Sequence, residues 1–157
     1  MRIDVKRLTA TAKLPTIAYG GDLGYDLYAD ESIALHPGIT AIVSTGIAIE
    51  MYDPWVDPWR DTPPRKYAKT YGGFIRDRSS MAIRGIVISG GVVDAGYRGE
   101  ILVTMTLLGA QESTCIFAGE KIAQIIPILA EPRAAIYDVK ELTESERGEK
   151  KHGSSGR

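Results

Sequence analysis

Short apolar runs alternate with glycine- and proline-rich breaks along most of this chain. Residues 2–8 alternate charged and apolar side chains, as a half-buried β-strand does. Residues 33–50 contain two more short strands around a Pro-Gly and a Thr-Gly pair. Residues 119–127 form a further apolar strand with one amide side chain, Gln124, inside it. A buried amide needs hydrogen-bond partners, which are either backbone groups or a ligand.

The most informative stretch is residues 90–101, which lies between two apolar runs, 86–88 and 101–108. β-Branched runs broken by glycine and aspartate predict a strand, a tight turn and a second strand. Asp94 then ends the first strand and Tyr97 opens the second, so that a carboxylate and an aromatic ring lie close together. Glycines at 90, 91, 96 and 99 would let another molecule approach the backbone. Asp and Gly are also ordinary turn residues, so a plain hairpin is the alternative.

Residues 20–29 predict another extended segment with a carboxylate on it. Leu23, Tyr25 and Leu27 would share one face, with Asp26 on the other. Asp26 is then either an exposed surface aspartate or a carboxylate that reaches a metal-bound water.

Residues 73–85 predict a strand that runs into a single helical turn. Ser79 or Ser80 would cap this turn, and Gly85 would end it. The free N–H groups of a helix start bind phosphate, and a neighbouring arginine, Arg78, can fork onto phosphate oxygens. A capped turn with a surface arginine is the alternative.

Two segments differ in composition from the rest. Residues 53–71 carry four prolines, which do not fit inside a sheet, and predict a surface loop with Trp55 and Trp59 as its means of packing. A self-packed loop and a partner contact are both open for this tryptophan pair. After Leu142 the chain is polar and cannot form a core, which is typical of a flexible tail.

Composition and charge narrow the possible functions. A chain of 157 residues with 44% hydrophobic residues fits one folded domain, and 17 glycines and 8 prolines favour strands and turns over long helices. The net charge of −1 gives no basic surface for nucleic acid. No apolar run approaches the ~20 residues that span a membrane, and the charged N-terminus does not resemble a secretory signal. The single cysteine, Cys115, suits a reducing compartment. We therefore expect an intracellular, cytoplasmic protein.

Five short motifs follow one another over nearly the whole chain. They are Gly24-Tyr25-Asp26-Leu27, Arg78-Ser79-Ser80, Gly91-Val92-Val93-Asp94-Ala95-Gly96-Tyr97-Arg98-Gly99, Gly119-Glu120-Lys121-Ile122-Ala123-Gln124, and Arg147-Gly148 with His152-Gly153-Ser154-Ser155-Gly156. The ordered set resembles the trimeric dUTPase family. This resemblance implies an all-β, jelly-roll-like barrel or sandwich of short strands with one short helix. It also implies a homotrimer with sites shared between subunits, and Mg²⁺-dependent hydrolysis of dUTP to dUMP and pyrophosphate. Such a reaction lowers dUTP and supplies dUMP for thymidylate synthesis.

The resemblance also implies roles for single residues. Asp94 would be the base that activates the attacking water, and Gln124 would hold the α-phosphate and that water. Arg147 would close over the phosphates with the tail, and Asp26 would act on the metal through water. The substrate-binding residues would be Arg78, Ser79, Ser80, Gly90, Gly91, Val92, Val93, Tyr97, His152, Gly153, Ser154 and Ser155.

Among these, Tyr97 would lie under the deoxyribose, and the backbone at 90–92 would read the uracil edge. Ser79 would bond an oxygen between the phosphates. His152 stands where the family usually has phenylalanine, and its imidazole can still stack on uracil. The resemblance divides the chain into a β domain over 1–142, with a loop insertion at about 53–71, and a C-terminal glycine-rich arm over 143–157 that would be exchanged within the trimer.

Two other functions are compatible with parts of this pattern. The first is a bifunctional dCTP deaminase and dUTPase of the same fold, which carries a catalytic glutamate in the strand after the hairpin. Thr104 stands at that position here and cannot shuttle a proton, which disfavours deamination. The second is a non-catalytic, nucleotide-responsive β-sandwich that binds a protein through Trp55 and Trp59. The presence of Asp94, Gln124 and Arg147 disfavours it.

Overall fold

The structure is a computed structural model that describes residues 1–53, 70–109, 112–130, 136–141 and 143–144. Most of the predicted loop 53–71, with Trp55 and Trp59, lies outside the described residues. So do five predicted site residues of the arm, which are Arg147, His152, Gly153, Ser154 and Ser155.

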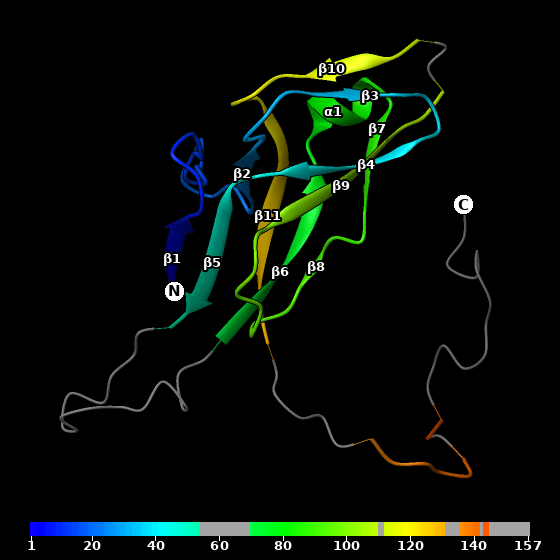
Figure 1. Ribbon diagram of the computed structural model, residues 1–157. Coiled ribbons are helices and arrows are strands. Elements are labelled where there is room, and N and C mark those ends of the chain that lie inside the picture. The colour runs from blue at the N-terminus through cyan, green and yellow to red at the C-terminus, as the bar shows by residue number, and fades with distance from the viewer. Residues whose placement is uncertain (54–69, 110–111, 131–135, 142, 145–157) are drawn as a thin grey trace, which may run out of the picture.

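Three antiparallel sheets make up the described part of the chain (Figure 1). In the largest sheet, the strand order is β1 (Arg2–Arg7), β5 (Ile47–Tyr52), β6 (Thr70–Asp77), β11 (Lys121–Leu129) and β2 (Tyr25–Tyr28), with β8 (Val92–Val93) also on β6. A three-stranded sheet has the order β4 (Thr40–Ser44), β9 (Leu102–Leu107) and β7 (Ile86–Ser89). β3 (Ile33–Leu35) pairs with β10 (Thr114–Ile116). The described helix is α1 (Ser79–Ile83).

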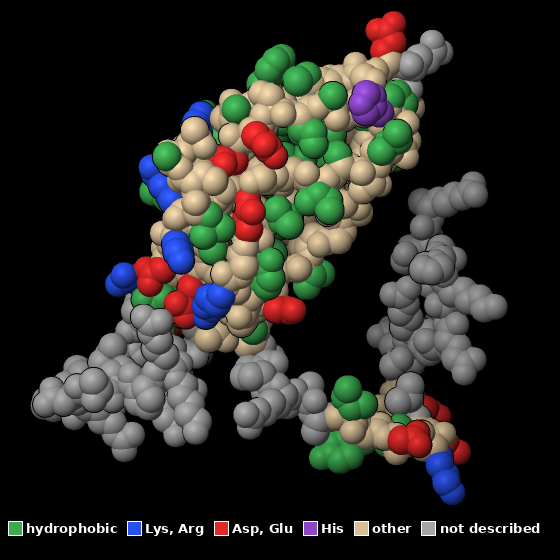
Figure 2. All heavy atoms as spheres, in the orientation of Figure 1, with side chains coloured by type: hydrophobic (Ala, Val, Ile, Leu, Met, Phe, Trp, Pro, Cys, Tyr) green, Lys and Arg blue, Asp and Glu red, His purple; other side chains and the backbone are tan. Residues whose placement is uncertain are grey.

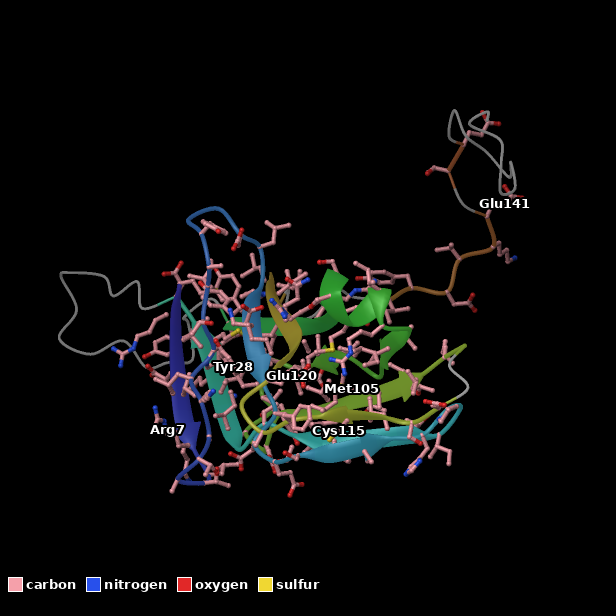
Figure 3. The ribbon with its side chains drawn as sticks, turned by 90° about the horizontal axis from the view of Figure 1, so that it is seen from above. Arg7, Tyr28, Met105, Cys115, Glu120 and Glu141 are labelled. Atoms are coloured by element: carbon pink, nitrogen blue, oxygen red, sulfur yellow. The ribbon has the colours of Figure 1, made fainter. Side chains whose placement is uncertain are left out.

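In Figure 3, the strands β1 and β5 of the large sheet run across the direction of β9 in the β4-β9-β7 sheet. These two sheets form separate layers of the fold. The core lies between them. β9 shows how the sequence makes such a layer, because Val103, Met105 and Leu107 are at most 1% exposed while Leu102 is 45% exposed. Each buried apolar side chain stabilises the fold by roughly 1.5–3 kcal/mol, so period-two alternation fixes which face of the strand is inside. The predicted all-β, jelly-roll-like fold with one short helix is therefore confirmed.

Two strand predictions were wrong in detail. Residues 33–50 contain parts of three strands, β3, β4 and β5, and not two. Gly38 and Gly46 both adopt positive φ angles, at 72° and 64°, which lets the chain turn tightly enough for the extra strand. In the segment before β2, Leu23 is 78% exposed and lies outside the strand, whereas Leu27 is fully buried as expected.

The predicted hairpin around Asp94 was also wrong in its pairing. β7 does pair with β9, from Ile86 opposite Leu107 to Ser89 opposite Thr104. The residues between them do not form a tight turn, because β8 leaves this sheet and pairs with β6 in the other one. Tyr97 therefore does not open a strand. It closes a separate turn, in which its N–H donates to the Asp94 carbonyl at 3.0 Å.

The start of the helical turn also differs from the prediction. Arg78, and not a serine, stands at the N-cap of α1, and no side chain caps the helix there. The chain enters α1 directly from β6, which places both serines inside the helix instead of before it. Gly85 ends the segment with a φ of 75°, as predicted.

Candidate active site

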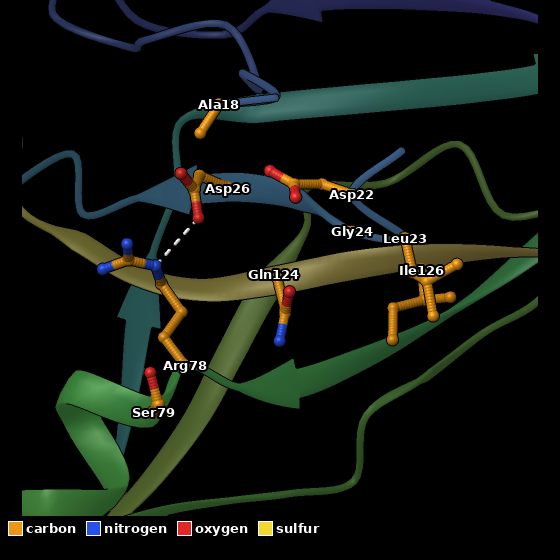
Figure 4. A pocket seen from close by; sticks show the side chains of 9 residues that line it. All are labelled: Ala18, Asp22, Leu23, Gly24, Asp26, Arg78, Ser79, Gln124 and Ile126. Atoms are coloured by element: carbon orange, nitrogen blue, oxygen red, sulfur yellow. Dashed lines mark hydrogen bonds and ion pairs between the residues drawn. The ribbon is translucent and has the colours of Figure 1, made fainter. Parts of the chain in front are cut away.

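The first cluster of predicted site residues lines a pocket of about 420 Å³ beside β2 and β11 (Figure 4). Asp26 comes from β2, Gln124 from β11, and Arg78 and Ser79 from the start of α1. Asp22 and Gly24 contribute from the loop before β2, and Ala18, Leu23 and Ile126 complete the lining. The sequence therefore brings a carboxylate, a guanidinium, a hydroxyl and an amide to one polar hollow. Ser80 is not part of this lining, and it accepts a hydrogen bond from Arg78 Nη1 at 3.3 Å.

Asp26 is held between two cations. Arg78 Nε donates to Asp26 Oδ1 at 2.8 Å, and Lys121 Nζ contacts Oδ2 at 2.7 Å. The hydrogen bond to Asp26 raises the pKa of Lys121 above its ordinary value, so the lysine stays protonated at neutral pH. The side chain of Asp26 is 13% exposed, which makes it a half-buried ion-paired carboxylate and not the free surface aspartate that was the alternative.

Lys121 was not among the predicted site residues. Strict alternation along β11 would place Lys121 and Gln124 on opposite faces of the strand. A bulge between Lys121 and Ala123 breaks this alternation, so that Lys121 reaches Asp26 while Gln124 lines the same pocket as Asp26. The bulge leaves the adjacent residues Ile122 and Ala123 both fully buried, and in the sequence it is marked by no more than this adjacent apolar pair.

Gln124 is fixed by its neighbours. Its Nε2 donates to the Asp77 carbonyl at 3.0 Å, so its partner is a backbone group, one of the two alternatives for this amide. A Cβ at Gly24 would lie 2.5 Å from Gln124 Oε1, so a side chain at residue 24 would force the amide to shift. The second N–H of Nε2 remains available to a ligand in the pocket.

The second cluster lies in a different hollow of about 350 Å³. Its lining includes five predicted residues, Gly90, Val92, Val93, Asp94 and Tyr97. Gly91 is not part of this lining, and its carbonyl accepts a hydrogen bond from the Ile75 N–H at 2.6 Å. The Tyr97 hydroxyl donates to the Glu100 carbonyl at 3.0 Å, which holds the ring against the chain. A flat aromatic ring and a carboxylate thus share one hollow with the apolar residues Ile75, Ile101 and Leu102, and its lining also includes Glu100 and Thr104.

The two clusters do not meet within one chain. Val93 lies opposite Gly73, and Gly72 lies opposite Ile128, so Asp94 is level with Ile128 and two strands away from β11. Gln124 is four residues further along β11. At about 3.4 Å per residue and about 4.8 Å per strand, the Cα atoms of Asp94 and Gln124 are roughly 17 Å apart. The two side chains reach at most about 9 Å between them, and a shared water adds about 5–6 Å. One chain therefore cannot place both side chains on the same water.

Comparison with known proteins gives the same result as the motifs. The family model for dUTPase matches residues 64–156. A deoxyuridine 5'-triphosphate nucleotidohydrolase from Clostridium kluyveri is 38% identical over 99% of this chain and 99% of its own length. One from Thermobifida fusca is 37% identical over 99% of this chain and 79% of its own length.

The chain belongs to the dUTPase family. A solved structure of the dUTPase of Staphylococcus bacteriophage 80alpha with dUpNHpp has a TM-score of 0.79 and 26% sequence identity, over 99% of both chains. The dUTPase of phage phi11 of S. aureus has a TM-score of 0.72 at 20% identity and shares the fold. Both similarities extend over almost the whole of this chain, so the sheets described above are those of a dUTPase.

Proposed function

We propose that this protein hydrolyses dUTP to dUMP and pyrophosphate by attack of water on the α-phosphate. The observation that carries this proposal is the chemistry of the two hollows. One combines Asp94 with the Tyr97 ring and apolar side chains, which suits a nucleoside and a general base. The other combines Arg78, Ser79 and Gln124, which suits phosphate oxygens. Relatives that match nearly the whole chain carry the name of this activity.

We infer that a complete site forms between copies of the chain in a closed homotrimer. The separation of about 17 Å between Asp94 and Gln124 supports this, because a second copy can bring its Gln124 hollow to the first copy's Asp94. Apolar residues on the outer side of the β4-β9-β7 sheet offer a contact surface. Ile42 is 61% exposed and Leu102 is 45% exposed. Hydrophobic side chains are also scattered over the face of the molecule that Figure 2 shows.

The C-terminal segment supports the same arrangement. Residues 136–141 run away from the sheets (Figure 1), and Ile136, Tyr137 and Val139 are 96%, 79% and 55% exposed. Three apolar side chains with little cover in their own chain suit a segment that packs on a neighbour. We propose that residues 1–142 form the β domain and that residues 143–157 form an arm that closes over the substrate of another copy. Arg147, His152 and the glycine-serine run would then contact the phosphates and the base.

The residues of this chain act mainly by positioning the attacking water and the phosphates of the substrate. Asp94 takes the proton of the attacking water, and Gln124 of the adjoining copy donates its remaining N–H to that water or to the α-phosphate. Arg78 is aligned by Asp26 through Nε, and within the described residues its Nη2 has no partner. This nitrogen can donate to a phosphate oxygen as negative charge moves onto the leaving pyrophosphate. Ser79 donates to an oxygen between the phosphates, and the Tyr97 ring leaves no room for a 2′-hydroxyl.

Asp26 and its neighbours fit Mg²⁺ only when the substrate supplies most of the ligands of the ion. Within the described residues, no group of three or more His, Cys, Asp or Glu side chains could hold a metal ion. Asp26 keeps acceptor sites for water on both oxygens despite its two cations. Mg²⁺ retains several waters and prefers substrate phosphates with one or two carboxylates, so Asp26 would contact it through water. When bound, the ion neutralises charge on the triphosphate.

Deamination of dCTP is not favoured by the structure. Thr104 lines the same hollow as Asp94, so it is placed where a proton-shuttling residue would act. A threonine hydroxyl is too weak an acid and too weak a base to shuttle the proton at neutral pH. We also infer that the protein acts in the cytoplasm, where a cysteine such as Cys115 stays reduced. For the part of the chain that the structure describes, no helix has the length and apolar character that a bilayer crossing requires.

The Asp94→Asn variant tests the proposed function. Asparagine keeps the size of the side chain and its hydrogen bonds but cannot accept the proton, so kcat for dUTP should fall by roughly 10²–10⁴-fold. Binding of a non-hydrolysable dUTP analogue should be largely kept. Glu31→Gln is the matched control, because it neutralises an exposed carboxylate that lines neither hollow. Products from dUTP, dCTP and dTTP in Mg²⁺ should be identified for each variant. Near-normal turnover by Asp94→Asn would remove Asp94 from the mechanism.

A further inference from the structure

Arg98 follows the turn that carries Asp94, and its side chain lies on the side away from the hollow that Asp94 lines. Its neighbour Tyr97 lines the hollow that contains Asp94. Arg98 instead lines a separate groove of about 330 Å³ between β1 and β5, together with Glu50. Consecutive side chains therefore point to opposite sides of the chain, one toward the proposed substrate and one toward β5.

The guanidinium of Arg98 makes three hydrogen bonds that involve this turn. Nη1 donates to the carbonyl oxygens of Ala95 and Tyr97, each at 2.9 Å. Nη2 donates to Glu50 Oε1 on β5 at 2.7 Å. The turn itself is closed by the Tyr97 N–H on the Asp94 carbonyl at 3.0 Å. One planar group thus joins two carbonyls of the turn to a strand of the large sheet.

The chain after the turn has its own attachments. The Gly46 N–H donates to Glu100 Oε1 at 2.8 Å, and the Ile101 N–H donates to the Ile47 carbonyl at 2.8 Å. Within the part of the chain that the structure describes, the hydrogen bond that ties residues 94–98 to another strand is the one from Arg98 to Glu50. Asp94 itself is exposed, so packing alone does not fix it.

We propose that Arg98, anchored by Glu50, is a positioning residue that holds the Asp94 carboxylate in line with the attacking water. The inference rests on the proposed function, because it concerns how the base of that reaction is oriented. A planar guanidinium keeps three acceptors at fixed relative positions, which a flexible ammonium does not do. The side chain of Arg98 is 49% exposed, so this ion pair adds little to the stability of the fold. A displacement of about 1 Å at the base, by contrast, costs up to roughly 10²-fold in rate.

The test compares Arg98→Met with Arg2→Met. Arg2 is a matched control because its Nε also pairs with a carboxylate of the large sheet, that of Asp4, at 2.6 Å. Its side chain is 61% exposed and does not contact the turn. Arg98→Met should lower kcat for dUTP by about 10–100-fold. Its KM should change by less than about threefold, because the phosphate-binding groups lie in the other hollow and the Tyr97 ring keeps its own hydrogen bond to the Glu100 carbonyl. Arg2→Met should leave both constants unchanged, and both variants should shift the unfolding midpoint to the same small extent.

Further variants show whether Arg98 acts through Asp94. In an Asp94→Asn background, Arg98→Met should lower kcat by less than about twofold more, because the group that it positions is already inactive. A full additional loss would overturn the proposal. Arg98→Lys should restore only part of the rate. Glu50→Ala should lower kcat less than Arg98→Met does, since the two carbonyl contacts of Arg98 remain.

Amide hydrogen exchange at Tyr97 gives a reading that does not depend on activity. Its N–H closes the Asp94 turn, so exchange should become about tenfold faster in Arg98→Met and stay unchanged in Arg2→Met. A wild-type protein without activity on dUTP would refute the proposed function, while this comparison would still show whether Arg98 holds the turn. Unchanged exchange in Arg98→Met, or kcat equal to that of Arg2→Met, would overturn the proposed role of Arg98.

Discussion

Gln124 illustrates how single residues in this fold depend on their neighbours. Its Nε2 is bound to the Asp77 carbonyl at 3.0 Å, and its Oε1 faces Gly24. Both contacts come from elements distant in sequence, and together they select one orientation of the amide. The remaining N–H can then point into the pocket with little loss of side-chain entropy on binding.

Gly24→Ala should disturb this orientation. A Cβ at position 24 would lie 2.5 Å from Gln124 Oε1, so the amide must rotate or shift. We expect kcat for dUTP to fall about tenfold or more, because a displaced Gln124 no longer aligns the water with the phosphate. The measurement is steady-state hydrolysis of dUTP.

Gly20→Ala is the control for this prediction. A Cβ at position 20 would meet nothing within 4 Å, and the residue lies in the same loop. Its activity should match the wild type. Equal losses in the two variants would show that loop flexibility, and not the contact with Gln124, determines the rate.

The sequence indicated which candidate residues line a common pocket better than it indicated their hydrogen-bond partners. Asp26, Arg78, Ser79 and Gln124 do line one pocket. Arg78 was predicted as a phosphate-binding residue, but its hydrogen bond to Asp26, which lies 52 residues earlier, was not predicted. The contact depends on how β2, β11 and the end of β6 are arranged, and no local pattern of residue types reports such a long-range pairing.

At the scale of elements, apolar periodicity located strands but not their pairing. β1 was predicted from its alternation, and it pairs with β5 along its whole length. β8 has only two residues, and its pairing with β6 instead of β9 was not predicted. Such a short strand carries too little alternation to specify a register. Its place is set by the close approach of Gly91 to β6, where the Ile75 N–H donates to the Gly91 carbonyl.

Asp77 joins the two layers at the end of β6. Its Oδ1 accepts a hydrogen bond from the Ile88 N–H of β7 at 2.7 Å, while its carbonyl accepts from Gln124. β6 belongs to the large sheet and β7 to the three-stranded sheet, so the carboxylate satisfies a backbone donor that the sheet ladder leaves unpaired.

Asp77→Ala should therefore destabilise the protein. Loss of a charged acceptor leaves the Ile88 N–H unpaired, which costs about 1–3 kcal/mol of the free energy of unfolding. Urea unfolding at one fixed protein concentration measures this cost, since assembly would make the midpoint concentration-dependent. Asp77→Asn retains an acceptor oxygen and should lose less than half as much. A loss of the same size in both variants would mean that the negative charge, and not the hydrogen bond, stabilises the junction.

At the scale of the whole molecule, the sequence indicated candidate catalytic residues but did not show that they lie apart. The motifs resemble those of one family site. The sequence alone, however, does not show which of these residues lie close together in one chain. Sheet register supplies this information, because it places Asp94 and Gln124 two strands and four residues apart. The single chain therefore carries two incomplete halves of the proposed site.

Mixed trimers test this whole-molecule arrangement. Asp94→Asn homotrimers lack the base, and Gln124→Ala homotrimers lack the amide, so each should be nearly inactive. After the two variants are unfolded, mixed in equal amounts and refolded together, every mixed trimer contains one junction at which an intact Asp94 meets an intact Gln124. Such a trimer should recover about a third of wild-type activity, and a randomly assembled population about a quarter. If one chain supplied both residues to its own site, no chain in the mixture would carry an intact pair and no activity would return. Mass measurement of the mixed trimers, together with dUTP hydrolysis that stays at the level of the separate variants, would therefore exclude a site shared between subunits.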